Sequence, residues 1–119
     1  FTDAAFTIVE TVQALAAAAL GRMGDARAVE PLAGALASGD ERVRNAAAGG
    51  LLALGRDAVT SIIGLLSDGN AVVRFYAASL LGMLGDPRAL GPLEERRGDA
   101  DADVREAVQR ALERIRKGE

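Results

Sequence analysis

The sequence contains no cysteine and no histidine among its 119 residues. Without cysteine there can be no disulfide framework, no thiol nucleophile and no zinc site with cysteine ligands. Without histidine there is no imidazole base, which excludes a Ser-His-Asp triad and an HExxH metalloprotease motif. Carboxylate, lysine or arginine chemistry remains possible, but no motif in the sequence supports it. We therefore expect no enzyme, no catalytic residue, no metal site and no cofactor.

Aromatic residues, net charge and long apolar runs are also scarce. The chain has three Phe, one Tyr and no Trp, and its formal net charge is −3. A slightly acidic protein has no overall field that draws it to nucleic acid or to an anionic membrane. No segment approaches the roughly 18 apolar residues of a membrane-spanning helix. The first charges are Asp3 and Glu10, which argues against a signal peptide, so cytoplasm is the default location.

Small residues are abundant, with 25 Ala and 14 Gly, and they belong to an internal repeat. The dipeptides Val12-Gln13, Val43-Arg44, Val73-Arg74 and Val104-Arg105 follow one another at steps of 31, 30 and 31 residues. A leucine lies eight residues after each valine, and a glycine lies twelve residues after the first three. The whole chain, residues 1–119, is therefore predicted to be one repeat domain, with repeats that start near residues 12, 43, 73 and 104.

Each repeat predicts two helices. The longer helix begins after an N-cap residue, Asp40, Asn70 or Asp101, and a glycine follows its last turn in two of the copies. The shorter helix carries Pro31 or Pro92 near its start, where the missing N–H costs least. Two short helices cannot bury an apolar face alone, so such repeats stack. We predict an all-α fold, a right-handed αα superhelix of about seven helices in about 3.5 repeats.

The repeat resembles HEAT-like repeats of the kind first described in phycobilin lyases, over about residues 12–114. The resemblance rests on three segments: Ala28-Val29-Glu30-Pro31-Leu32, Val43-Arg44-Asn45-Ala46-Ala47-Ala48 and Leu80-Leu81-Gly82-Met83-Leu84-Gly85-Asp86-Pro87-Arg88-Ala89. It implies a solenoid in which the outward face of each longer helix varies between repeats and lines a concave binding surface. The HEAT-repeat hydroxylases use His-Glu metal pairs, so the absence of histidine excludes that mechanism.

The charged residues that recur with the repeat have two interpretations. They are Asp25, Arg44, Arg74, Asp86 and Arg105. An arginine stripe could bind phosphates, but a charge that recurs with the fold is more simply structural. We predict a ladder in which each arginine bonds a turn carbonyl or an aspartate of the preceding repeat. The alternating acids Asp99, Asp101 and Asp103 lack the glycine and glutamate of an EF-hand loop, so we interpret them as a helix N-terminus.

The segment 71–84 is apolar on two faces, unlike its counterparts in the other repeats. One face is the expected core, and the other combines Phe75 and Tyr76, two of only four aromatic residues, with further apolar residues. Either neighbouring helices cover this second face, or it contacts a protein partner, since aromatic residues and Met are enriched in interface cores. The predicted partner-binding residues, with their counterparts in the preceding repeat, are Val72, Phe75, Tyr76, Ser79, Met83, Arg42, Asn45 and Gly49.

We expect a non-catalytic scaffold that binds a partner protein on the concave face of the solenoid. Two alternatives stay open: a bilin lyase-like subunit, and a DNA-binding module that uses Arg42, Arg110 and Arg114. The N-terminal end carries Phe1, Phe6, Ile8 and Val9 without a cap residue at the position that matches Asp40, so its helix begins near Asp3 or after Thr7. We expect a fragment of a longer array, or an end that a partner or a second copy of the chain covers.

Overall fold

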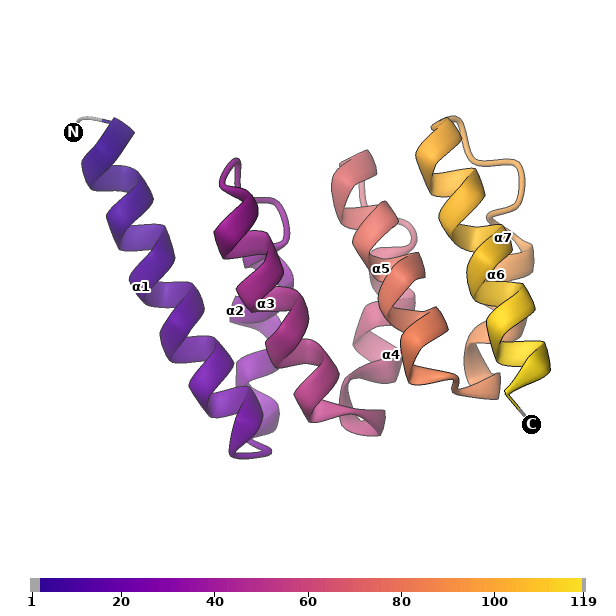
Figure 1. The fold of residues 1–119 in the computed structure, drawn as a ribbon, viewed down its shortest axis with the longest axis horizontal. Helices are drawn as coiled ribbons and strands as arrows, with labels where there is room; N and C mark the ends of the chain where they lie inside the picture. The colour runs from indigo at the N-terminus through magenta and orange to yellow at the C-terminus, as the bar shows by residue number, and fades with distance from the viewer. Residues whose placement is uncertain (1–2, 119) are drawn as a thin grey trace. The chain divides into compact units, whose positions relative to one another are not determined.

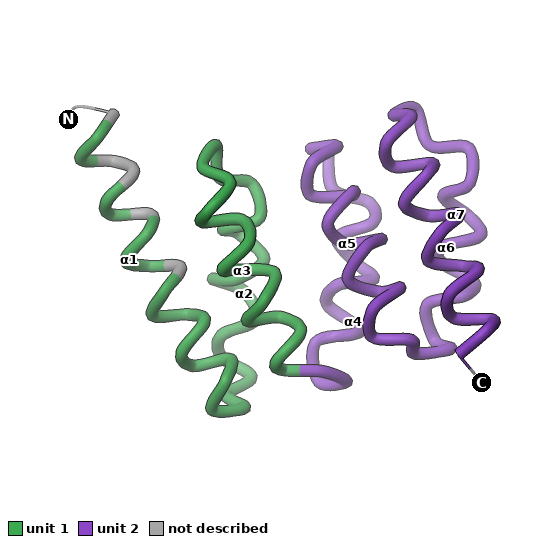
Figure 2. Tube along the Cα trace, viewed as in Figure 1, with its two compact units in different colours: residues 1–54 green, residues 55–119 purple. Residues whose placement is uncertain are grey.

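The computed structural model describes residues 3–118, except for the side chains of residues 3, 6, 7, 10 and 14. Over this range it has seven α-helices, two short 3₁₀ helices and no β-strand, which confirms the predicted all-α, HEAT-like fold (Figure 1). The chain divides into two compact units, residues 1–54 and residues 55–119 (Figure 2). Each unit has its own set of packed helices and its own buried side chains.

Unit 1 contains three α-helices and one 3₁₀ turn. They are α1 (Asp3–Arg22), η1 (Ala26–Ala28), α2 (Val29–Ala35) and α3 (Glu41–Leu54). The long helices α1 and α3 pack side by side, and the short helix α2 contacts both of them (Figure 1). Leu32 and Leu36 of the α2 segment and Leu51 of α3 are fully buried, so the core of unit 1 lies among these helices.

Unit 2 repeats this pattern and adds one more short helix. Its elements are α4 (Arg56–Leu65), α5 (Ala71–Leu84), η2 (Pro87–Ala89), α6 (Leu90–Glu94) and α7 (Ala102–Lys117). The long helices α5 and α7 pack together, α4 contacts α5 and α6 contacts α7. Ile62, Leu81, Leu93 and Leu112, one from each α-helix, are buried in the core of unit 2.

The long helices begin where the cap residues predict. A carboxylate oxygen of Asp40 accepts from the Arg42 N–H at 2.8 Å, and the Asn70 amide oxygen accepts from the Val72 N–H at 2.9 Å. Asp101 likewise accepts from two backbone N–H groups of α7. These side chains satisfy donors that an α-helix leaves free in its first turn.

Helix α1 begins at Asp3, so of the two predicted starts the one after Thr7 is wrong. The residues between these positions include two alanines, which favour a helix, and no glycine or proline to interrupt it, which accounts for the longer element. Ile8 and Val9 are exposed on it. Phe1 and the side chain of Phe6, which were predicted to belong to the same apolar end, lie outside the described residues.

Glycines allow the long helices to approach each other closely within each unit. A methyl group on Gly21 of α1 would lie only 2.7 Å from the Gly50 carbonyl oxygen of α3. In unit 2, a methyl group on Gly82 of α5 would lie 3.0 Å from the Ala111 Cα of α7. Both positions are buried. The abundance of small residues in the sequence therefore has a structural cause, which is the close packing of α1 on α3 and of α5 on α7.

Candidate protein-binding site

Helix α5 has a fully buried face and a second face that stays partly exposed. Val73, Ala77 and Leu81 on the first face are at most 2% exposed. On the second face, Phe75 is 38% exposed and Met83 is 52% exposed, although both are large apolar side chains. Such side chains on a helix surface indicate a contact site when they gather in a patch.

Phe75 and Tyr76 form an aromatic pair at this second face. Their ring centroids are 5.7 Å apart, and the rings stand nearly perpendicular at 87°. This edge-to-face arrangement suits the quadrupoles of the two rings and holds both side chains in place. Tyr76 is half-buried, so Phe75 is the more accessible member of the pair.

A groove of about 260 Å³ runs between α5 and α7 beside this pair. Both helices line it, and their close approach at Gly82 and Ala111 forms part of its floor. The other lining residues are Phe75, Ser79 and Met83 from α5, and Asp103, Glu106, Ala107, Arg110 and Arg114 from α7. The groove thus has one wall with two large apolar side chains and one wall with four charged side chains.

The α5 wall of this groove consists of residues that the sequence analysis proposed as partner contacts, whereas Arg110 and Arg114 of the α7 wall were named there only for the DNA-binding alternative. The repeat alignment contained the necessary signal, because adding 31 to Phe75, Ser79 and Met83 gives Glu106, Arg110 and Arg114. Equivalent faces of two successive long helices lie next to each other when the helices pack in parallel register. The charged residues at these positions did not by themselves indicate a binding site, because an exposed helix face is normally charged.

The α7 wall is mixed in charge, and one end of the helix is basic. Glu106 and Arg110 form an ion pair at 2.5 Å, with both side chains largely exposed. Arg114 and Lys117 follow toward the C-terminal end of α7, and neither joins an ion pair within residues 3–118. On the α5 wall, the Ser79 hydroxyl donates to the Phe75 carbonyl at 3.0 Å. Arg114 is therefore the charged group of this wall most available to an acidic group of a partner, and Lys117 lies beyond the groove on the same helix.

The remaining predicted contact residues lie outside this groove. Val72 is on α5 and is 45% exposed, but it does not line the groove. Arg42, Asn45 and Gly49 lie on α3 in unit 1, where all three are exposed. The Arg42 guanidinium pairs with the Asp40 carboxylate at 3.1 Å. The groove therefore brings together three of the predicted residues, Phe75, Ser79 and Met83, with Tyr76 packed against Phe75.

The recurrent arginines all bond the turn that precedes their own helix. The NH1 groups of Arg44, Arg74 and Arg105 donate to the carbonyl oxygens of Ser38, Asp68 and Asp99, at 2.7, 2.8 and 2.7 Å respectively. In each case the acceptor lies six residues earlier in the chain. This shared geometry fixes the turn between a short helix and the next long helix.

Arg74 also binds a carboxylate, but one that comes later in the chain. Its Nε and NH2 donate to the two oxygens of Asp99, at 3.0 and 3.1 Å. Of the two predicted kinds of acceptor in the preceding repeat, the turn carbonyl is the one that all three arginines bind, and the one aspartate carboxylate bound, Asp99, does not come from the preceding repeat. Burial raises the pKa of Asp99, but the Arg74 side chain and the Asp101 N–H lower it more, so the net pKa is below the ordinary value.

Asp25 and Asp86 do not join the recurrent arginines. Asp25 accepts hydrogen bonds from the side chain and the backbone N–H of Arg27, and Asp86 does the same with Arg88. These bonds, from the side chain first, lower the pKa of each aspartate from 3.8 to about 2. Each aspartate is the N-cap of a 3₁₀ turn, η1 or η2, so its role in the described structure is local.

The alternating acids before α7 take part in the same kind of local bonding. Asp99 accepts from the Asp101 N–H at 3.0 Å, and Asp101 accepts from the Asp103 N–H at 2.8 Å. Among residues 3–118, no group of three or more acidic side chains is placed to hold a metal ion. The geometry of the acids matches that of a helix N-terminus.

Tandem two-helix repeats define this chain as an α-helical repeat protein. The family model of HEAT repeats matches residues 10–62 and 40–113, so the chain belongs to the HEAT repeats. Members of this family generally mediate protein–protein interaction and are typically non-enzymatic scaffolds. A comparison with curated proteins finds none that matches. In the described part of the chain, no helix is both long and apolar enough to cross a membrane.

Proposed function

We propose that this protein is a non-catalytic scaffold and that the groove between α5 and α7 binds a segment of a partner protein. The observation that supports this most directly is the exposure of Phe75 and Met83 beside a charged wall. An apolar residue of the partner would lie against these two side chains. An acidic residue next to it would face Arg114 and Lys117 at the basic end of α7.

The size of the groove favours a protein segment over a small-molecule cofactor. Its volume of about 260 Å³ lies below the roughly 300–1,000 Å³ that is typical of small-molecule pockets. A groove of this size suits one or two side chains of a larger ligand. Protein interfaces concentrate their binding energy in a few such anchors, with aromatic residues enriched among them. In unit 1, the candidate contacts are three exposed residues of α3: Arg42, Asn45 and Gly49.

A display library of short random peptides tests this function without requiring the partner to be identified first. The wild-type protein should enrich peptides with a large apolar residue next to Asp or Glu. Met83→Glu should weaken binding of these peptides at least about tenfold, because it places a charge beside the apolar anchor. Arg114→Ser should weaken binding less and should reduce its dependence on salt concentration.

The matched control is Met23→Glu, which makes the same substitution at another exposed methionine. Met23 follows α1 in unit 1 and does not line the α5–α7 groove. This variant should bind the selected peptides as the wild type does, and circular dichroism should show equal helix content in all the variants. Absence of any enriched peptide, or equal loss in the two methionine variants, would contradict the proposal.

A further inference from the structure

The charged side chains that line the α5–α7 groove come from α7 and follow a fixed order along it. Asp103 and Glu106 lie toward the N-terminal end of this helix, and Arg110 and Arg114 lie toward its C-terminal end. The only charged residue of α5, Arg74, is bound to a carboxylate outside the groove. The groove therefore has an acidic end and a basic end, and a ligand that matches both must carry opposite charges at its own two ends.

The two outermost charges of this wall are available to a ligand. Glu106 and Arg110 pair with each other, so their charges largely cancel in the middle of the groove. Asp103 and Arg114 are exposed, and neither joins an ion pair in the part of the chain that the structure describes. They are eleven residues apart, which is about 16 Å along a helix axis. A ligand helix of about three turns spans the same distance.

The walls of the groove favour a helical ligand over an extended one. Away from their ends, α5 and α7 bond their backbone groups internally, and the Ser79 hydroxyl already donates to the Phe75 carbonyl. An extended segment would find no backbone partner in these walls for the N–H and C=O groups that it turns toward them. A helix satisfies its own backbone groups and presents only side chains to the groove.

The order of the charges also sets the direction of such a helix. Acids near its N-terminus and bases near its C-terminus stabilise a helix, because they complement its macrodipole. Only a helix antiparallel to α7 brings such acids to Arg114 and such bases to Asp103. Helices α5 and α7 pack side by side and run in the same direction (Figure 1), so their dipoles favour the antiparallel placement as well.

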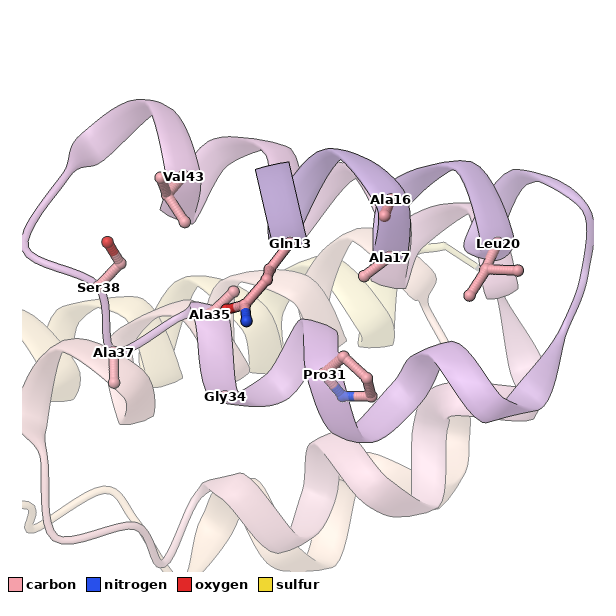
Figure 3. A pocket seen from close by; sticks show the side chains of 10 residues that line it. All are labelled: Gln13, Ala16, Ala17, Leu20, Pro31, Gly34, Ala35, Ala37, Ser38 and Val43. Carbon is pink, nitrogen blue, oxygen red and sulfur yellow. The ribbon is translucent and has the colours of Figure 1, made fainter. Parts of the chain in front are cut away.

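A second groove, in unit 1, lacks this kind of information. It has a volume of about 710 Å³ and lies between α1, α2 and the turn after α2, with Gln13 and Ser38 as its polar side chains (Figure 3). None of the ten lining residues shown there is charged. Its side chains therefore specify neither the charge nor the direction of a ligand, in contrast to those of the α5–α7 groove.

We infer that the α5–α7 groove binds an amphipathic helix of a partner protein, antiparallel to α5 and α7, with acids at its N-terminal end and bases at its C-terminal end. Its apolar residues, three and four positions apart, would lie against Phe75 and Met83. An acid in its first turn would face Arg114, and a base in its last turn would face Asp103. This inference rests on the proposed function, to which it adds the conformation, the charge order and the direction of the bound segment.

A designed peptide of about twelve residues, the acid-first peptide, tests the charge order. It has leucines at positions i, i+3, i+4 and i+7, glutamates in its first turn and arginines in its last turn. A lactam staple on the opposite face keeps it helical, since a free helix this short is marginal in water. Fluorescence anisotropy should show binding to the wild-type protein, and Arg114→Gln should weaken it at least about threefold at low salt.

The matched control is a peptide in which glutamines replace the glutamates. Arg114→Gln should not weaken binding of this peptide, because the charge pair is already absent. Asp103→Asn and the arginines of the acid-first peptide should be coupled in the same way. Circular dichroism should show equal helix content in the wild type and both variants. Arg114→Gln that weakens both peptides equally, or neither, would overturn the inferred charge order.

The absence of cysteine from the sequence allows a direct test of the direction. The acid-first peptide, with a cysteine added at its N-terminus, is incubated with Lys117→Cys or with Ala102→Cys in a glutathione redox buffer. Both positions are exposed, one at each end of α7, and each lies one turn from a groove residue. Mass spectrometry should find the mixed disulfide mainly with Lys117→Cys. A preference for Ala102→Cys would overturn the antiparallel placement.

A linear peptide of the same composition with a central proline tests the conformation. It should bind at least about tenfold more weakly than the acid-first peptide, because proline breaks the helix. If the random library selects ligands but the acid-first peptide binds no better than the proline peptide, the inference is wrong and the proposed function stands. If the library selects nothing and the acid-first peptide does not bind, both are wrong.

A second copy of the chain is the other occupant that the groove could have. Sedimentation velocity of the wild-type protein, with and without the acid-first peptide, distinguishes it. The inference expects a monomer in the absence of the peptide. A dimer that the peptide dissociates would overturn the inference and would assign the groove to self-association.

Discussion

Two adjacent glycines of α3 have different surroundings, one crowded and one open. Substituting each of them therefore tests the close packing of the helices. A methyl group on Gly50 would lie 2.8 Å from a Leu32 methyl carbon and 3.1 Å from the Ala18 Cα, whereas a methyl group on Gly49 would have nothing within 4 Å. We expect Gly50→Ala to lower the free energy of unfolding by about 1–3 kcal/mol through overpacking. Gly49→Ala should raise it by about 0.5–1 kcal/mol through helix propensity. Urea unfolding measures both, and equal effects would contradict the packing.

The buried pair of Arg74 and Asp99 gives a second residue-scale prediction. The Asp99 side chain is 2% exposed, and Asp99→Asn would leave the Arg74 guanidinium with a neutral partner in a largely buried position. We expect a loss of about 1–3 kcal/mol in unfolding free energy at neutral pH. Asp57→Asn, at an exposed site in the first turn of α4, should change it by less than about 0.5 kcal/mol. Chemical denaturation of the two variants provides the comparison.

Single residues also show where sequence reasoning ends. The sequence predicted a turn carbonyl or an aspartate as the acceptor of Arg44, Arg74 and Arg105, but it could not decide between them, because a backbone carbonyl leaves no mark in the sequence. Asp25 and Asp86 recur equally well, yet each binds an arginine two residues later. A side chain with several donors or acceptors in reach selects its partner by geometry, and spacing along the chain does not supply that geometry.

At the scale of helices, the helix starts that a cap residue marks were predicted correctly from the sequence. Helices α3, α5 and α7 begin directly after their cap residues, as the sequence indicates. The 3₁₀ turns η1 and η2 were not predicted, since a cap that accepts from the N–H two residues later is compatible with either kind of helix. The start of α1 was left open because no cap residue stands at the position that matches Asp40.

The end of α5 provides a prediction at this scale. Gly85 has φ +67° and a left-handed conformation, and its N–H donates to the Leu81 carbonyl at the C-cap. Gly85→Ala should lower the free energy of unfolding by about 1 kcal/mol, because an L side chain disfavours this conformation. Gly91→Ala is the matched control, since Gly91 has no positive φ and its Cβ would meet nothing within 4 Å. Thermal unfolding followed by circular dichroism compares them, and a similar loss in both variants would count against the cap.

For the molecule as a whole, ionisation sets the pH range of stability. Asp25 and Asp86 have pKa values of about 2 in the folded protein, because hydrogen bonds from Arg27 and Arg88 favour their charged forms, against an ordinary value of 3.8. The unfolded chain therefore binds more protons than the folded protein between about pH 5 and pH 2. The free energy of unfolding should have its full value above this window and should fall as the pH drops through it. No histidine is present to titrate near neutrality. Urea unfolding from about pH 7 down to about pH 2.5 measures this dependence. The double variant Asp25→Asn with Asp86→Asn should start lower and fall less steeply, whereas a profile parallel to that of the wild type would assign the acid sensitivity to other carboxylates.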